Sequence, residues 1–290
     1  MRKEQEMFDL ILGIAKSDER IRAVYMNGSR TNPKIEKDKY QDFDIVFVVT
    51  EIESFMANKN WIEKFGDIAI VQEPDWNDMV TGLYGGKYDF SRRYAWLMLF
   101  KDGNRIDLGI EIKEETIKNF KEDKLTIILL DKDNILPIIS SPTDEDYYVK
   151  KPCQDEFTAY CNNFWWCLQN VAKGIARDEL PYAMEMYNNI VRQLFHGIID
   201  WYIGTLTDFS VSTGKMGKFY KKYLSPELYD LYTKTYSNSD YNNFWSAIFE
   251  ACDLFRIMAI DVSKHLNFSY NEDWDKNIID YLYKVKDGTL

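Results

Sequence analysis

The sequence predicts an α+β protein in which a mixed sheet with helices is followed by an all-α helical bundle. Short apolar or alternating runs typical of strands occur only before about residue 131, and helical spacing of apolar residues dominates after residue 152. The chain has 290 residues, which favours two domains. Residues 140–152 are polar and contain two prolines, which suits a linker. We therefore expect one domain over residues 1–150 and a second over residues 151–290.

The elements of the first half follow from its local patterns. Apolar residues recur at helical spacing over Met7–Ala15, and a strand is expected over Ile21–Met26. Phe43–Val49 is continuously apolar and β-branched, as in a buried central strand. Ala95–Phe100 and Arg105–Ile112 flank an Asp-Gly turn, so they should form an antiparallel hairpin.

Two further elements complete the expected first domain. Residues 113–124 are charged and could form a helix, and Leu125–Leu130 is a short apolar run. Beyond the linker we expect helices over Phe157–Ala176, Ala183–Tyr202, Pro226–Tyr236, Tyr241–Leu266 and Asp273–Val285.

Composition and charge exclude several classes of protein. The net charge of −11 disfavours a broad surface for nucleic acid. No apolar run approaches the ~20 residues of a membrane span, and the N-terminus has no secretory pattern, so a cytoplasmic location is expected. The four cysteines and two histidines make no zinc pattern, so the cysteines are interpreted as reduced thiols. We expect a monomer or a weak homodimer.

Three aspartates form the strongest chemical pattern. Asp42 and Asp44 project from one face at the entry of an apolar strand, where their repulsion and desolvation favour a cation between them. Asp107 lies on the polar face of the alternating strand Arg105–Ile112. If the two strands pair, Asp107 can join the first two in binding Mg²⁺ through oxygen ligands, an arrangement suited to phosphoryl or nucleotidyl transfer.

A turn before these aspartates offers a place for phosphates. Gly28 allows close backbone approach, Ser29 adds a hydroxyl and Arg30 a positive charge. Gly-Ser and Asp-x-Asp are each common in ordinary turns and strand entries. Their combination after a strand, with a later strand aspartate, is more specific, and Asp107 would be the base or a ligand of a second metal ion.

These residues resemble the signature of the nucleotidyltransferase fold shared with DNA polymerase β. The segments Met26–Arg30 and Tyr40–Val49 are similar to those of the aminoglycoside 6-adenylyltransferases. The similarity continues through Leu97–Leu108 and residues 129–133, and then into Phe164-Trp165-Trp166, Ala172-Lys173-Gly174 and Val211–Lys215. It spans nearly the whole chain.

The resemblance implies adenylyl transfer from ATP, with Mg²⁺, to a hydroxyl of streptomycin, releasing pyrophosphate and inactivating the drug. It also implies that residues 151–290 bind substrate. Because an acidic chain needs local positive charge to bind a nucleotide, we assign Lys173 and Lys215 to the nucleotide phosphates. Trp165 and Trp166 are candidates to line the acceptor site beside Tyr182. Lys218 is equally well explained as a solvated lysine, and aromatic residues at helical spacing usually pack in a core.

One departure from the family pattern keeps other acceptors open. Asn163 stands where the family has an acid, and Asp155 or Glu156 could compensate for its charge. The alternatives are the same chemistry on another metabolite or on a protein side chain, and a catalytically silent nucleotide-binding protein.

Overall fold

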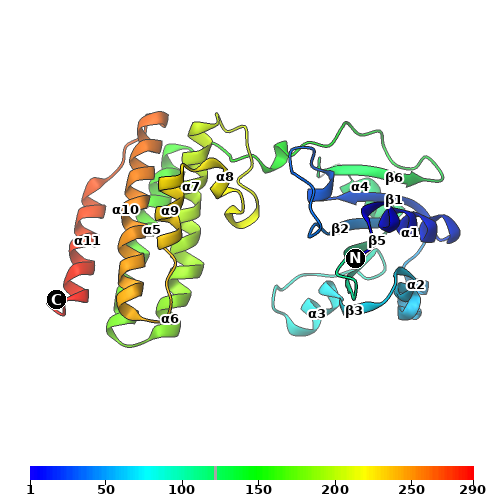
Figure 1. Cartoon of the computed structure of the whole chain (residues 1–290), viewed down its shortest axis with the longest axis horizontal. Coiled ribbons are helices and arrows are strands. Elements are labelled where there is room, and N and C mark those ends of the chain that lie inside the picture. Colours follow the sequence, from blue (N-terminus) through cyan, green and yellow to red (C-terminus); the bar gives the residue numbers. More distant parts are fainter. Residues whose placement is uncertain (121–122) are drawn as a thin grey trace. The chain divides into compact units, whose positions relative to one another are not determined.

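The computed structural model describes residues 1–120 and 123–290, which divide into two compact units, Met1–Asp146 and Tyr147–Leu290 (Figure 1). The first unit contains every strand of the described residues and the second is helical, which confirms the predicted fold class. Across these same ranges, no helix combines the length and apolar character that crossing a bilayer requires.

The first unit is built on a mixed six-stranded sheet of order β3-β4-β5-β2-β1-β6. Its strands are β1 (Ile21–Asn27), β2 (Phe43–Val49), β3 (Ile68–Gln72), β4 (Arg93–Phe100), β5 (Arg105–Ile112) and β6 (Thr126–Asp131). β2 and β5 are parallel neighbours and the other pairs are antiparallel. The pairing on which the three-aspartate hypothesis depended is therefore present.

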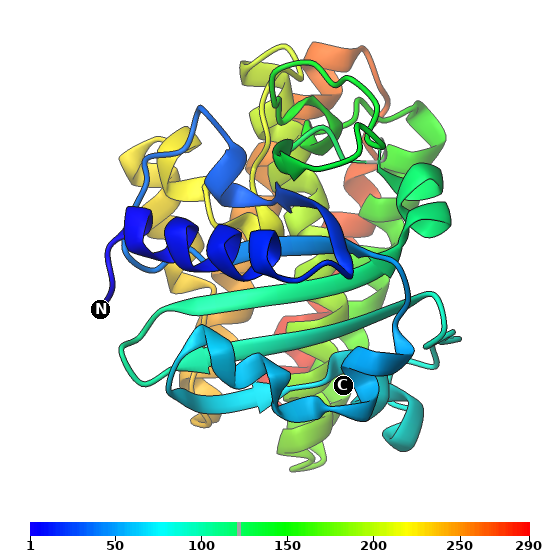
Figure 2. The same ribbon diagram turned by 90° about the vertical axis from the view of Figure 1, so that its right-hand side faces the viewer.

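One face of the sheet carries the core of this unit. Helix α1 (Glu4–Ser17) buries Met7, Ile11 and Ala15 against apolar side chains of the central strands, and Figure 2 shows it lying across them. Helix α2 (Glu53–Ala57) and the short helical turns of residues 59–65 add aromatic residues to the same core. Because strand side chains alternate between faces, the aspartates of β2 and β5 face the opposite side of the sheet.

Several elements of this unit differ from expectation. Strand β3 and helix α3 (Pro74–Thr81) were not predicted, although Ile68–Val71 is a short apolar run. In the structure β3 is an edge strand with mostly exposed side chains. The helix expected over residues 113–124 is the shorter α4 (Lys113–Asn119), and part of that prediction, residues 121–122, lies outside the described residues.

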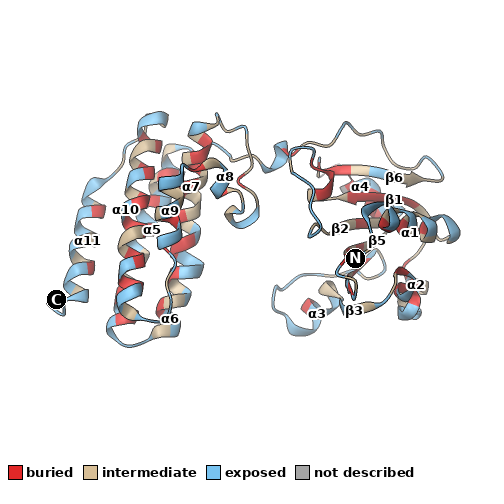
Figure 3. Ribbon diagram, viewed as in Figure 1, coloured by how far each residue is buried: buried red, intermediate tan, exposed pale blue. Residues whose placement is uncertain are grey.

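The second unit packs long helices around an aromatic core. It comprises α5 (Gln154–Ala176), α6 (Leu180–Glu185), α7 (Arg192–Leu206), α8 (Tyr220–Tyr223), α9 (Pro226–Lys234), α10 (Tyr241–Leu266) and α11 (Glu272–Lys286). The rings of Phe164 on α5 and Phe255 on α10 stack with their centroids 3.7 Å apart. Buried residues recur at helical spacing along both helices (Figure 3). The helix expected over Ala183–Tyr202 is interrupted by a π-helical segment, Met186–Val191, which apolar spacing alone did not reveal.

Candidate active site

The polar face of the sheet brings the three predicted aspartates together. Asp44 on β2 is the direct register partner of Asp107 on β5, and Asp42 immediately precedes β2. On the other side of β2, Asp44 pairs with Asn27, the last residue of β1, so the turn that follows β1 begins beside the aspartates. Parallel pairing of β2 with β5 is thus what assembles residues that are far apart in the sequence.

Gly28 fits this place because a side chain there would collide with Asp44. Its φ is +79° and its ψ is −162°, a backbone conformation almost restricted to glycine. A Cβ atom at this position would lie 2.9 Å from the Cγ of Asp44 and closer still to its Oδ2. Ser29 begins the short helical turn Ser29–Thr31 directly after it. The turn and Asp44 are therefore in direct contact.

Burial and mutual repulsion perturb two of the carboxyl groups. Desolvation, then the charges of Asp107 and Asp42, raise the pKa of Asp44 to about 6. Desolvation also raises the pKa of Asp42, although Arg105 opposes the shift. Raised values mean that the folded chain holds these carboxylates without sufficient positive charge, as is common where a protein binds a cation or substrate.

Arg105 supplies the positive charge within the cluster. Its Nε donates to Asp107 Oδ1 at 2.7 Å, its second terminal nitrogen donates to Asp107 Oδ2 at 2.7 Å, and its first lies 3.3 Å from Asp42 Oδ2. The guanidinium thus lies between the two carboxylates. Within residues 1–120 and 123–290, no three Asp, Glu, His or Cys side chains are arranged to hold a metal ion as they stand. The alternation of β5 placed Arg105 beside Asp107, but sequence reasoning gave it no role.

Arg30 is placed differently from the expected phosphate contact. Its side chain is only 6% exposed, and its guanidinium donates to the backbone oxygens of Gln41 and Asp42 and pairs with Glu4. It also stacks over the ring of Phe43 at 3.9 Å. The contacts tie the segment that leads into β2 to helix α1, so Arg30 positions Asp42 from inside the unit.

The remaining predicted residues belong to the helical unit. Lys173 on α5, Lys215 and Lys218 are exposed. Lys215 follows Gly214 in a loop that is anchored where the Phe219 N–H donates to the Thr213 carbonyl at 3.0 Å. Asp200 accepts a hydrogen bond from the Tyr220 hydroxyl beneath this loop.

The aromatic residues of α5 separate into core and surface. Trp165 is buried and its Nε1 donates to the Tyr270 hydroxyl at 3.2 Å, so it is a core residue and does not line an acceptor site. Trp166 is 62% exposed, and helical spacing places it on the face that also carries Asn163 and Lys173. The ring of Tyr182 lies against Gly174 beside this face.

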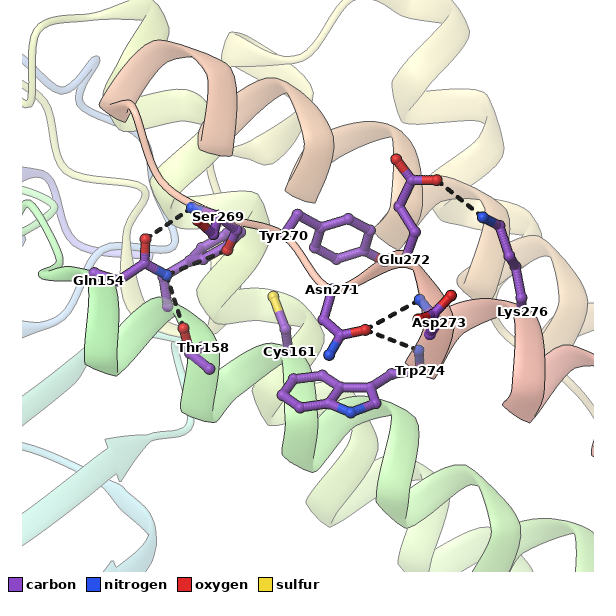
Figure 4. Close-up of a pocket in the computed structure, with 11 residues that line it drawn as sticks. Gln154, Thr158, Cys161, Ser269, Tyr270, Asn271, Glu272, Asp273, Trp274 and Lys276 are labelled. Carbon is purple, nitrogen blue, oxygen red and sulfur yellow. Dashed lines mark hydrogen bonds and ion pairs between the residues drawn. The ribbon is translucent and has the colours of Figure 1, made fainter.

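A cavity of about 670 Å³ in the helical unit is lined by none of the predicted site residues. It lies where α5 and α11 begin (Figure 4). The Gln154 side-chain amide hydrogen-bonds with Thr158 and Ser269, and the side-chain oxygen of Asn271 accepts from the backbone N–H groups of Asp273 and Trp274 in α11. The polar groups that line this cavity are hydrogen-bonded to one another at the first turns of α5 and α11, so we assign the cavity a structural role.

The four cysteines are free thiols, as expected. Cys161 and Cys252 are buried, and burial raises the pKa of the Cys161 thiol to about 12. Thiols of this kind are unreactive.

A paired sheet with a glycine turn against an aspartate cluster, joined to a helical unit, defines a nucleotidyltransferase class of enzyme. The family model described as streptomycin adenylyltransferase matches residues 1–285. The chain belongs to this family, and is therefore an adenylyltransferase.

Curated relatives are similar over almost their full length. An aminoglycoside 6-adenylyltransferase of Campylobacter jejuni is 37% identical over 99% of this chain and 96% of its own. A protein of the same name from Bacillus subtilis (strain 168) is 38% identical over 97% of both chains, and one from Staphylococcus aureus is 34% identical. A crystal structure of an aminoglycoside 6-adenyltransferase from Bacillus subtilis is 33% identical over 99% of both chains, with a TM-score of 0.47.

Proposed function

We propose that this protein transfers an adenylyl group from ATP to a hydroxyl of an aminoglycoside in a magnesium-dependent reaction. The proposed acceptor is streptomycin at its 6-position, and the products are pyrophosphate and the inactivated drug. The observation that carries the proposal is the register pairing of Asp44 with Asp107, beside a glycine turn that leaves no room for a side chain. The names of the full-length relatives support the acceptor class.

The carboxylates suit magnesium by their donor chemistry. Asp42, Asp44 and Asp107 would hold the ion, because Mg²⁺ prefers carboxylate oxygens. The raised pKa of Asp44 reflects burial and then repulsion by the other two carboxylates, and a bound cation would offset both. When bound, Mg²⁺ neutralises charge on the phosphates and on the leaving pyrophosphate.

The protein's own residues bind and orient the two substrates. Gly28 and Ser29 receive the triphosphate, which can approach the backbone closely because Gly28 has no side chain. Asp107 accepts the proton of the acceptor hydroxyl as that oxygen attacks the α-phosphorus in line with the leaving pyrophosphate. Lys173 and Lys215 of the helical unit supply further positive charge to the phosphates.

The helical unit also contributes to acceptor binding in this proposal, through the exposed α5 face that carries Asn163 and Trp166. Aminoglycosides carry amino or guanidino groups that are protonated at neutral pH, so the net charge of −11 attracts them electrostatically.

The test is incubation of the purified protein with Mg²⁺, ATP and streptomycin, followed by measurement of pyrophosphate and of the mass of the drug. We expect the drug to gain one adenylyl group. Asp44→Asn and Asp107→Asn should each lose this activity, whereas Asp9→Asn, an exposed helix position in the same unit, should retain it.

Three outcomes would redirect the assignment. Near-normal activity of Asp44→Asn would refute the proposed site. ATP binding without modification of any aminoglycoside would favour another metabolite or a protein acceptor, which a mass gain on that acceptor would reveal. ATP binding without transfer to any acceptor would favour a silent nucleotide-binding protein.

A further inference from the structure

A second cavity lies on the same face of the sheet as the aspartates. Its volume is about 270 Å³, and Asn27, Val46, Ala95, Gly109 and Glu111 are among the residues that line it. Val46 and Gly109 are register partners, two residues along β2 and β5 from the Asp44 and Asp107 pair. Two strand residues span about 7 Å, so the cavity begins about one sugar ring away from Asp107.

The direction of the cavity from the aspartates indicates which substrate it receives. The Gly28 turn lies beside the start of β2, and the cavity extends from Asn27, which precedes this turn, to Glu111, toward the other end of β5. In an in-line displacement, the attacking hydroxyl and the leaving pyrophosphate are on opposite sides of the α-phosphorus. With the triphosphate at Gly28, the end of the cavity at Glu111 is therefore on the acceptor's side.

The cavity also has an oriented carboxylate. Glu111 Oε1 accepts hydrogen bonds from the hydroxyls of Tyr25 and Thr116, which are neutral donors. Burial, together with the Glu111 charge, raises the pKa of Tyr25, so this hydroxyl stays protonated and keeps donating. Among the ion pairs of the described residues, Glu111 has no basic partner. Arg93, its register partner on β4, also lines the cavity, and its Nε lies 3.9 Å from Asp75 Oδ2.

We propose that this cavity is the acceptor subsite for a protonated amino or guanidino group, with Glu111 as its ligand. The inference rests on the proposed function, since the acceptor must be cationic. It makes Glu111 a specificity-determining residue: a carboxylate held by two hydroxyls binds a cation next to the reacting hydroxyl and repels the phosphates of ATP.

The test compares Glu111→Gln with Glu114→Gln, an exposed position on α4. Glutamine can still accept from Tyr25 and Thr116, so the variant removes the charge and keeps the local hydrogen bonds. We expect the KM and the equilibrium Kd for streptomycin to rise about tenfold, the loss of one charge-assisted hydrogen bond, while the KM for ATP is unchanged. Glu114→Gln should match the parent.

A steric variant gives an independent measure. Ala95→Leu places added bulk in the cavity without changing any charge, and should also weaken streptomycin binding while sparing ATP. If circular dichroism shows that Glu111→Gln is poorly folded, the effect of Ala95→Leu on streptomycin binding tests the subsite instead.

Binding and turnover are measured separately so that the two proposals can fail separately. If the parent modifies streptomycin but neither variant changes its KM, the subsite is refuted and the function stands. If streptomycin binds in a Glu111-dependent way without turnover, the subsite stands and the function fails. A raised KM for ATP would assign the cavity to the nucleotide and overturn the inference, and an absence of aminoglycoside binding by the parent would overturn both.

Discussion

Replacement of Gly28 by alanine should nearly abolish adenylyl transfer without unfolding the chain. The added Cβ would lie 2.9 Å from the Asp44 Cγ and closer to its Oδ2, so the carboxylate must move by about 1 Å. Misplacement of a catalytic group by that distance costs about a hundredfold in rate. The backbone conformation of residue 28 adds about 1–3 kcal/mol of destabilisation.

Gly82→Ala is the matched control, because Gly82 also has a positive φ, +63°, but a Cβ there meets nothing within 4 Å. It should cost about 1 kcal/mol in stability and leave activity unchanged. Pyrophosphate release with saturating ATP and streptomycin measures turnover, and urea unfolding measures stability. Equal activity of the two alanine variants would refute the reasoning that Gly28 is required by Asp44.

Three further predictions concern residues outside the cluster. Arg30→Met should destabilise the first unit by about 3 kcal/mol, because the carbonyls of residues 41 and 42 and Glu4 lose a buried cation; an unchanged urea midpoint would contradict this. Trp165→Ala should lower the free energy of unfolding of the helical unit by about 3–5 kcal/mol, because Trp165 is buried. Trp166→Ala should change only the KM for streptomycin, because Trp166 is exposed. Equal urea midpoints for the two variants would contradict this prediction. Burial, then the Arg192 charge, lowers the pKa of His196 to about 4, below its unfolded value of about 6.5, so stability present above pH 6.5 should fall by about 2 kcal/mol between pH 7 and pH 5. His196→Asn should flatten this urea-unfolding difference, and an unaltered pH profile would assign the loss to other groups.

The sequence anticipated elements whose burial pattern is regular. Tyr241–Leu266 was predicted with its observed ends from apolar residues at helical spacing. The structure adds the caps, Asp240 at its start and Asn267 at its end. The strand Phe43–Val49 was equally clear, since a continuous β-branched run is typical of a central strand. β3 was not predicted although Ile68–Val71 is apolar and β-branched; the structure places it at the edge of the sheet with mostly exposed side chains.

Local pattern also identified the chemical groups of the candidate site. The spacing of Gly28, Asp42 and Asp44 is local, and the alternation of β5 put Asp107 on a polar face, so these residues could be selected without coordinates. Their roles as ligands and base remain predictions for the variants above.

Tertiary structure alone decided how charge is distributed around those groups. The parallel pairing of β2 with β5 made Asp44 and Asp107 neighbours, placed Arg105 between the carboxylates and placed Glu111 in a cavity on the same face. The tertiary structure also buries the Arg30 side chain and pairs it with Glu4, whereas the sequence favoured a contact between Arg30 and phosphate. A sequence specifies which side chains are charged and which face of a strand they share, but electrostatic partners depend on strand register, which is set by contacts between residues distant in the chain.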